Sequence, residues 1–203
     1  MSEKPEPSSN TVLVIQGHPD PEGGHLCHAL AQAYAEGARK AGHRVIVVDV
    51  ARLDFPLLRS QEDFLRGEAP AALAEARGAL LEARHVALFF PLWLGTMPAL
   101  LKGFLEQLMR PGFAYAYAAD GKGFPKGLLE GRTARIVVTM GMPALVFRLW
   151  YLSAGLEIVR RNIFGLVGIT LVRTSAIGGV EGMGERRRAG WLASMDALGA
   201  AGR

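Results

Sequence analysis

Residues 11–25 read TVLVIQGHPDPEGGH, an apolar and β-branched run followed at once by a loop rich in glycine and proline. From Leu26 to Ala41, apolar and small residues recur at helical spacing, and Gly42 ends that pattern. A second apolar run, RVIVVD, follows at residues 44–49. This order of strand, loop, helix and strand predicts a βαβ unit and therefore a parallel sheet.

The same alternation continues along the rest of the chain. Further strands are predicted at residues 85–90, 135–139 and 168–177. Helices are predicted at residues 70–83, 98–109, 144–165 with a break at Gly155, and 181–198, while residues 51–69 are expected to be irregular. Five continuous apolar strands alternating with helices favour an α/β fold of the flavodoxin-like, doubly wound type, with a parallel sheet covered on both faces.

Length and composition define the expected organisation. The chain has 203 residues, of which half are hydrophobic, and we expect one domain over residues 11–203 after a flexible N-terminal tail at residues 1–10. The tail begins MSEKPEPSSN, with acidic residues and prolines where a signal peptide would be basic and then apolar. Prolines and a glycine interrupt the most apolar stretch, residues 85–101. These features predict a cytoplasmic protein with no membrane span.

The excess of positive charge lies near the end of the chain. Of 23 basic and 19 acidic residues, residues 148–203 hold 8 and 4, which leaves 15 of each in the preceding part. The basic run there, residues 186–188, has no interleaved aromatic residues and is typical of a solvated helix face, so no nucleic acid partner is expected.

The single cysteine and the scattered histidines do not predict a metal site. Cys27 has no partner for an internal disulfide and is expected to be inert packing on a helix. His28, His43 and His85 have no partners at metal-ligand spacing and are expected to be surface or boundary residues.

In a doubly wound sheet, ligands bind beyond the carboxyl ends of the strands, where the strand order reverses. The first loop, GHPDPEGGH, leads directly into a helix, so its glycines and the free N–H groups of the helix start suit an anion such as phosphate. Taken alone, the loop favours a plain turn with two surface histidines, and its position after the first strand of the predicted sheet shifts the interpretation to a ligand site. The candidate phosphate-binding residues are His18, Gly23, Gly24, His25 and Leu26.

The loops after the third and fourth strands are apolar. PLWLGT at residues 91–96 is stiff and aromatic, which suits a flat heteroaromatic ring, although Trp93 and Leu94 would also fit as plain core residues. TMGMP at residues 139–143 repeats the pattern with a hydroxyl and a glycine. The candidate ring-binding residues are Pro91, Leu92, Trp93, Leu94, Thr139, Met140 and Gly141.

Three segments together resemble the NAD(P)H:quinone oxidoreductase family, which are flavin enzymes of flavodoxin-like fold. They are GHPDP at residues 17–21, FPLWLGTMPALLKGFLEQLMRPGFAY at residues 90–115 and TMGMP at residues 139–143. The similarity in layout extends over residues 11–200 and is greatest to the compact bacterial NAD(P)H-dependent members. It implies FMN or FAD with its phosphate at His18 and residues 23–26, and its ring between residues 91–94, Thr139 and Gly141.

The resemblance also implies a reaction and an assembly. Hydride would pass from NAD(P)H to flavin N5, and two electrons would then reduce a quinone or a similar small electrophile. Members of the family form homodimers with the site at the subunit contact, and residues 98–109, apolar on more than one face, suit either burial or such a contact.

The sequence departs from the family pattern at several positions. Glycine, Gly23 or Gly24, replaces a serine of the first loop, and Met142 replaces a second glycine after the fourth strand. Phe147 and Ser153 align with the tyrosine and histidine of a proton relay, so that relay does not carry over, and Tyr151 becomes the candidate catalytic residue.

Two alternative functions stay open at this point. One is azo or nitro reduction on the same fold. The other is a flavin-binding regulatory subunit of a membrane transporter, with the apolar segment 147–152, FRLWYL, as a partner-binding or peripheral membrane patch. The sequence does not decide between FMN and FAD or between NADH and NADPH, because no fingerprint with a ribose-binding acid follows a strand.

Overall fold

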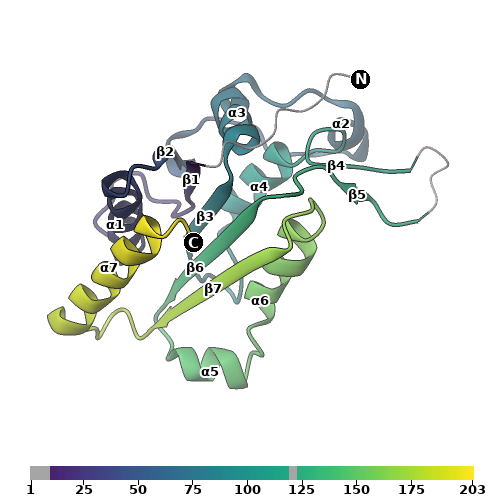
Figure 1. Ribbon diagram of the computed structural model, residues 1–203. Helices are drawn as coiled ribbons and strands as arrows, with labels where there is room; N and C mark the ends of the chain where they lie inside the picture. Colours follow the sequence, from purple (N-terminus) through teal and green to yellow (C-terminus); the bar gives the residue numbers. More distant parts are fainter. Residues whose placement is uncertain (1–9, 119–122) are drawn as a thin grey trace.

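The computed structural model describes residues 10–118 and 123–203 (Figure 1), so residues 1–9 of the predicted tail lie outside the described part. Its centre is a parallel sheet of β1 (Thr11–Gln16), β2 (Arg44–Asp49), β3 (His85–Pro91), β6 (Thr133–Met140) and β7 (Leu171–Gly178). The strands lie in the order β2-β1-β3-β6-β7. This is the flavodoxin-like order, and it confirms the predicted fold class.

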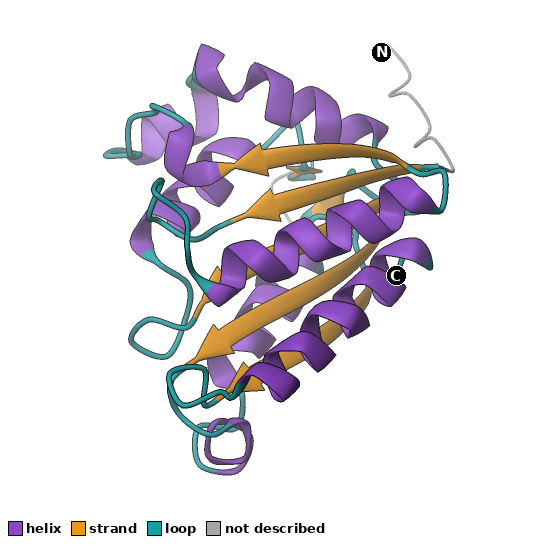
Figure 2. Cartoon of the chain, turned by 90° about the vertical axis from the view of Figure 1, so that its left-hand side faces the viewer, coloured by secondary structure: helices purple, strands orange, loops and turns teal. Residues whose placement is uncertain are grey.

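Alternation along the strands divides the core between two faces of the sheet. On β3, Val86 and Leu88 contribute to one hydrophobic cluster, whereas Ala87 and Phe89 contribute to the other. Helices α3 (Ala74–Glu82) and α4 (Ala99–Leu108) cover the first face, and α1 (Leu26–Lys40) and α7 (Glu185–Ala200) cover the second. Figure 2 shows α1 and α7 lying side by side across the sheet, with the arrows of the large parallel sheet pointing the same way.

Glycines allow α1 and α7 to pack closely. A Cβ atom at Gly37 would lie 2.0 Å from the backbone oxygen of Asp196, and one at Gly199 would lie 2.0 Å from the backbone oxygen of Tyr34. Because the obstacles are backbone atoms, no side chain fits at either position without separating the helices.

Two predictions about local structure are wrong. Residues 51–69, expected to be irregular, contain η1 (Val50–Arg52) and α2 (Gln61–Arg66), and the Ser60 hydroxyl caps α2 by accepting from Asp63 N at 3.1 Å. In the segment predicted to break at Gly155, the break instead falls between α5 (Ala144–Leu149) and α6 (Ala154–Glu157).

The break between α5 and α6 occurs where Leu152 and Ser153 take positive φ values of 50° and 52°. Gly155 lies inside α6, where a Cβ would lie 1.9 Å from the backbone oxygen of Gly95. It is therefore required for close packing against the loop after β3.

The remaining elements are short: η2 (Ala71–Leu73), β4 (Tyr115–Ala116), β5 (Lys126–Gly127) and the π-helix η3 (Ile158–Phe164). Helix α4 is buried within this chain, since Leu101, Phe104 and Leu108 are each 0% exposed. A group of exposed apolar side chains lies instead on and after α5. We call it the α5 patch, consisting of Leu145, Leu149, Trp150 and Leu152. Within the described residues, no helix has the length and apolar character needed to cross a membrane.

Candidate functional site

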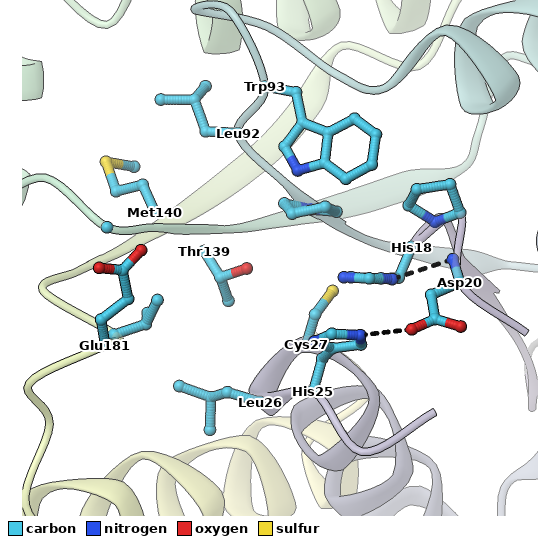
Figure 3. A pocket seen from close by; sticks show the side chains of 14 residues that line it. His18, Asp20, His25, Leu26, Cys27, Leu92, Trp93, Thr139, Met140 and Glu181 are labelled. Atoms are coloured by element: carbon cyan, nitrogen blue, oxygen red, sulfur yellow. Dashed lines mark hydrogen bonds and ion pairs between the residues drawn. The ribbon is translucent and has the colours of Figure 1, made fainter. Parts of the chain in front are cut away.

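A cavity of about 720 Å³ lies beyond the carboxyl ends of β1, β3, β6 and β7 (Figure 3). It includes the point between β1 and β3 where the strand order reverses, which is where the fold places ligands. The loop after β1 contributes His18, His25 and Leu26 to its wall. The loop after β3 contributes Pro91, Leu92 and Trp93, and the end of β6 contributes Thr139, Met140 and Gly141.

Four of the predicted site residues do not line this cavity: Gly23, Gly24, Leu94 and Tyr151. Gly23 and Gly24 have φ values of 81° and 78° and turn the chain into α1, so their contribution is to the backbone path. Leu94 is fully exposed at a turn, and Tyr151, 48% exposed, lies beside the α5 patch.

Leu94 points away because the loop after β3 forms a tight hairpin. Trp93 N donates to Thr96 O at 2.8 Å, and Thr96 N donates to Trp93 O at 3.0 Å. The two residues between them, Leu94 and Gly95, have φ values of 46° and 84°, as a two-residue hairpin turn requires. The hairpin thereby places the Trp93 ring at the cavity, as Figure 3 shows, and the Leu94 side chain at its exposed tip.

The loop after β1 is held by its own side chains. Asp20 N donates to His18 Nδ1 at 3.1 Å, and His25 Nε2 lies 2.7 Å from Asp20 Oδ2. Because His18 Nδ1 accepts, the neutral ring carries its proton on Nε2, the nitrogen that points toward the middle of the cavity in Figure 3. His18 is thus a neutral hydrogen-bond donor to a ligand.

Three histidine rings are stacked beside the cavity. The ring of His18 lies 4.0 Å from that of His25 and 4.8 Å from that of His28 between centroids. Burial, together with the neighbouring His25 and His28, lowers the pKa of His18 to about 4. Burial also lowers the pKa of His28. A bound anion would reverse these effects, because it favours the protonated form of the rings.

The first turn of α1 is open to an anion. Its N-cap residue, His25, makes no capping hydrogen bond with its side chain, and the first turn contains no acidic residue. The unpaired backbone N–H groups and the positive end of the helix dipole therefore remain available to a phosphate. Together with the Nε2 proton of His18, they form a set of donors that fits the phosphate of a flavin.

The end of β6 supplies a polar group and a flat surface. Thr139 is 5% exposed, and its backbone oxygen accepts from Leu92 N at 2.7 Å, which fixes the two apolar loops relative to each other. Next to it, a Cβ at Gly141 would lie 3.1 Å from Glu181 Oε1, so the glycine leaves room between β6 and the loop after β7. The space between these loops is where the sequence predicts a heteroaromatic ring.

Sequence reasoning missed five residues of the cavity wall: Pro19, Asp20, Cys27, Val180 and Glu181. Val180 and Glu181 follow β7, and the rule that placed the other loops would also have placed this one. Cys27 is 2% exposed, as expected of packing, and burial raises its pKa to about 12, which keeps the thiol protonated. Among the residues described by the structure, no cluster of histidine, cysteine or acidic side chains has the arrangement of a metal site.

Fold and site thus define a doubly wound α/β protein with a ligand cavity suited to a phosphate and a flat ring. The chain belongs to the family described as having a flavodoxin-like fold, which it matches over residues 10–198. A solved structure of NAD(P)H:quinone oxidoreductase from Methanothermobacter marburgensis is 23% identical with a TM-score of 0.76, covering 95% of this chain and 96% of that one. That likeness is one of fold.

Curated relatives carry oxidoreductase names. A ribosyldihydronicotinamide dehydrogenase-like protein of Penicillium crustosum is 30% identical over 64% of this chain and 57% of its own length. A protein named as an uncharacterized NAD(P)H oxidoreductase of Haemophilus influenzae is 24% identical over 87% of each chain. FMN-dependent NADH:quinone oxidoreductase 1 of Colwellia psychrerythraea is 30% identical over 45% of this chain and 44% of its own. These names confirm the resemblance to the NAD(P)H:quinone oxidoreductase family, although the chain spans little more than half the length of the Penicillium relative.

Proposed function

We propose that this protein is a flavin-dependent NAD(P)H oxidoreductase that reduces quinones or similar small electrophiles by two electrons. The observation that carries the proposal is the cavity at the carboxyl ends of the strands, where an uncapped helix start and a neutral histidine donor face an apolar wall. The family and the names of its relatives support the same class of activity.

In this proposal, different residues of the cavity wall bind different parts of the flavin. The N–H groups at Leu26 and Cys27 and the Nε2 proton of His18 would bind the phosphate. Leu92 and Trp93 would border the isoalloxazine ring and exclude water from one side of it. Thr139 and Gly141 would lie at its pyrimidine edge. Gly23 and Gly24 contribute through the course of the backbone alone.

When bound, the flavin would supply the redox chemistry by accepting a hydride at N5 from the nicotinamide and giving up two electrons to the acceptor. The chain positions the reactants and handles charge. Glu181 adds negative charge to the cavity wall at the loop after β7, which favours a cofactor whose phosphate lies at the helix start, where Asp20 is already paired with His25. Tyr151 is proposed as a proton donor, a role that requires its exposed hydroxyl to approach the ring.

We propose FMN as the flavin and NADH as the reductant. The relative from Colwellia psychrerythraea is named an FMN-dependent NADH:quinone oxidoreductase, and none of the relatives' names cited above mentions FAD. The Haemophilus relative is named for NAD(P)H, so NADPH is the second reductant to test.

We further propose a cytoplasmic homodimer organised as a single domain over residues 11–203. Helix α4, a candidate for the subunit contact, is covered within its own chain, whereas the α5 patch is exposed: Leu149 is 65% exposed and Trp150 is 82% exposed. A second copy covering the α5 patch would remove this apolar surface from water and bring Tyr151 into the interface. In the regulatory alternative, a transporter or membrane surface would cover the same patch.

The decisive experiment is the visible absorption spectrum of freshly purified protein, followed by anaerobic addition of NADH or NADPH. We expect a flavin spectrum, from bound or added FMN, that bleaches with at least one nucleotide and recovers with a quinone. If the flavin spectrum recovered with azo or nitro compounds but not with a quinone, the proposed acceptor would be an azo or nitro compound instead of a quinone. A colourless protein that takes up neither FMN nor FAD would overturn the proposed oxidoreductase activity and leave only a regulatory role that needs no flavin.

A further inference from the structure

The sheet face beneath α1 and α7 changes character along its strands. Toward the carboxyl ends it is apolar, with Phe89, Val137 and Ile177 in one hydrophobic cluster. Toward the amino ends, the strand register places His85 beside Thr133. Two residues further along β6 lies Arg135, so polar side chains interrupt the amino half of this face beside apolar ones such as Val12, the register partner of His85.

Three side chains are buried in this amino half. Tyr34 of α1 is 0% exposed, His85 of β3 is 4% exposed and Arg135 of β6 is 6% exposed. The rings of Tyr34 and His85 stack with their centroids 6.3 Å apart. The strand register places Arg135 beside Ala87, two residues after His85 and on the same face of the sheet, and its positive charge acts on the pKa of both Tyr34 and His85.

Each member of the cluster has a buried polar atom with no hydrogen-bond partner among the described residues. These atoms are Tyr34 Oη, His85 Nε2 and Arg135 Nε. The other ends of two of the groups are fixed: His85 Nδ1 lies 2.6 Å from Thr133 Oγ1, and Arg135 Nη1 donates to Ser175 Oγ at 2.9 Å. Buried polar groups are nearly always paired, so three unpaired atoms in one cluster indicate a missing partner.

The charge of the cluster indicates what kind of partner it is. Within the residues that the structure describes, no carboxylate lies at ion-pair distance from Arg135, and its register neighbour on β7 is Arg173, another cation. Burial lowers the pKa of Arg135, the Tyr34 hydroxyl partly offsets this by raising it, and Arg173 and Arg203 lower it again. A buried cation among cations is strongly unfavourable unless an anion compensates it, and water alone supplies no charge.

We propose that Tyr34, His85 and Arg135 form a buried binding site for one small inorganic anion of the chloride class. Tyr34 Oη and Arg135 Nε donate to the anion, and His85 donates from Nε2 when its Nδ1 accepts from the Thr133 hydroxyl. The anion links α1 to β3 and β6 at the amino ends of the strands, at the opposite end of the sheet from the cavity. It stabilises the folded chain and takes no part in the redox reaction.

The test is thermal unfolding of the full-length protein in a phosphate-free buffer, with chloride replacing gluconate at constant ionic strength. We expect the unfolding temperature to rise with chloride and to saturate. Tyr34→Phe keeps the stacked ring and removes only Oη, so it should raise the half-saturating chloride concentration about tenfold. Arg173→Gln, a substitution of the exposed neighbouring arginine, is the matched control and should keep saturation with a shift of less than about threefold.

A second measurement locates the anion directly. Crystals grown with bromide in place of chloride should show an anomalous scattering peak within hydrogen-bond distance of Tyr34 Oη and Arg135 Nε. The proposal is overturned by a wild-type protein with no saturable chloride response. It is equally overturned by an identical response in Tyr34→Phe, or by water without bromide at the cluster. None of these readouts depends on flavin binding.

Discussion

His18 and His85 lie at opposite ends of the same sheet, His18 just after β1 and His85 at the start of β3. They are 6% and 4% exposed, and burial lowers the pKa of each to about 4. Their surroundings differ: His18 lines the cavity, whereas His85 is enclosed between Tyr34 and Thr133. At the carboxyl ends of the strands, the loops leave hydrogen-bond donors such as His18 facing the cavity. At the amino ends, a similar polar side chain, His85, is enclosed between α1 and the sheet.

The largest expected effect comes from breaking the enclosure at the amino ends. Gly37→Val would place side-chain atoms inside the backbone of α7, since even a Cβ lies 2.0 Å from Asp196 O. We expect a loss of more than about 3 kcal/mol in the free energy of unfolding, or no folded protein. Urea unfolding followed by circular dichroism measures this loss.

Gly190→Ala is the matched control on α7, because a Cβ at Gly190 meets nothing within 4 Å. Replacing a helical glycine at an open position should leave stability unchanged or raise it by up to about 1 kcal/mol. If Gly37→Val were as stable as Gly190→Ala, the close packing of α1 on α7 would be wrong.

His18 and His85 should both make the free energy of unfolding depend on pH. FMN should change the share that comes from His18 and leave the share that comes from His85 unchanged. Both have a folded-state pKa near 4 against a usual value of 6.5, so the unfolded state binds protons more readily. Their contribution to stability is present above pH 6.5 and is lost as the pH falls toward 4. We expect His85→Leu to reduce that loss by about 2 kcal/mol, as measured by urea unfolding of the apoprotein from pH 8 to 4 in a chloride-free buffer, because an anion beside His85 would raise its pKa.

Saturating FMN separates the two ends in the same experiment. A phosphate at His18 favours its protonated form and raises its pKa, so FMN should flatten the remaining pH dependence of His85→Leu. The share that belongs to His85 should not respond to FMN. If FMN changed the pH dependence of stability only when His85 is present, the cavity would not be separate from the cluster of Tyr34, His85 and Arg135.

Most of the fold could be predicted because its signals are local. Apolar β-branched runs such as residues 11–16 and 135–139 specify buried parallel strands wherever they occur. Helix α2 was missed because it is six residues long and buries none of its side chains, so it carries no apolar periodicity. The break after α5 depends on backbone strain at Leu152 and Ser153, which has no signature in composition.

The parts of the candidate site whose position follows from strand order alone could be predicted from the sequence. The loops after β1, β3 and β6 were placed by that rule, whereas the orientation of Leu94 depends on a hairpin turn that residue types do not reveal. The cluster of Tyr34, His85 and Arg135 at the amino ends of the strands could not be predicted from the sequence. His85 was expected at the surface or boundary and is buried, because its environment is set by Tyr34, from a helix some 50 positions earlier in the chain.

The smallest expected effect concerns the apolar wall of the cavity. Trp93 is 51% exposed in the hairpin after β3, so Trp93→Ala should leave the fold intact while removing a ring surface from the flavin. Loss of one aromatic contact corresponds to about 1.4 kcal/mol, or about a tenfold higher Kd for FMN. Fluorescence titration of the apoprotein with FMN measures the Kd.

Leu171→Ala is the control from the other end of the sheet, at the start of β7, where the side chain is 55% exposed. It removes a comparable exposed apolar group and should leave the Kd for FMN unchanged. If both substitutions raised the Kd for FMN equally, the effect would come from a general destabilisation of the sheet and not from loss of a contact with the ring. Unchanged binding in Trp93→Ala, and likewise in Thr139→Ala, would move the flavin away from the carboxyl-end cavity, since both residues line it on opposite loops.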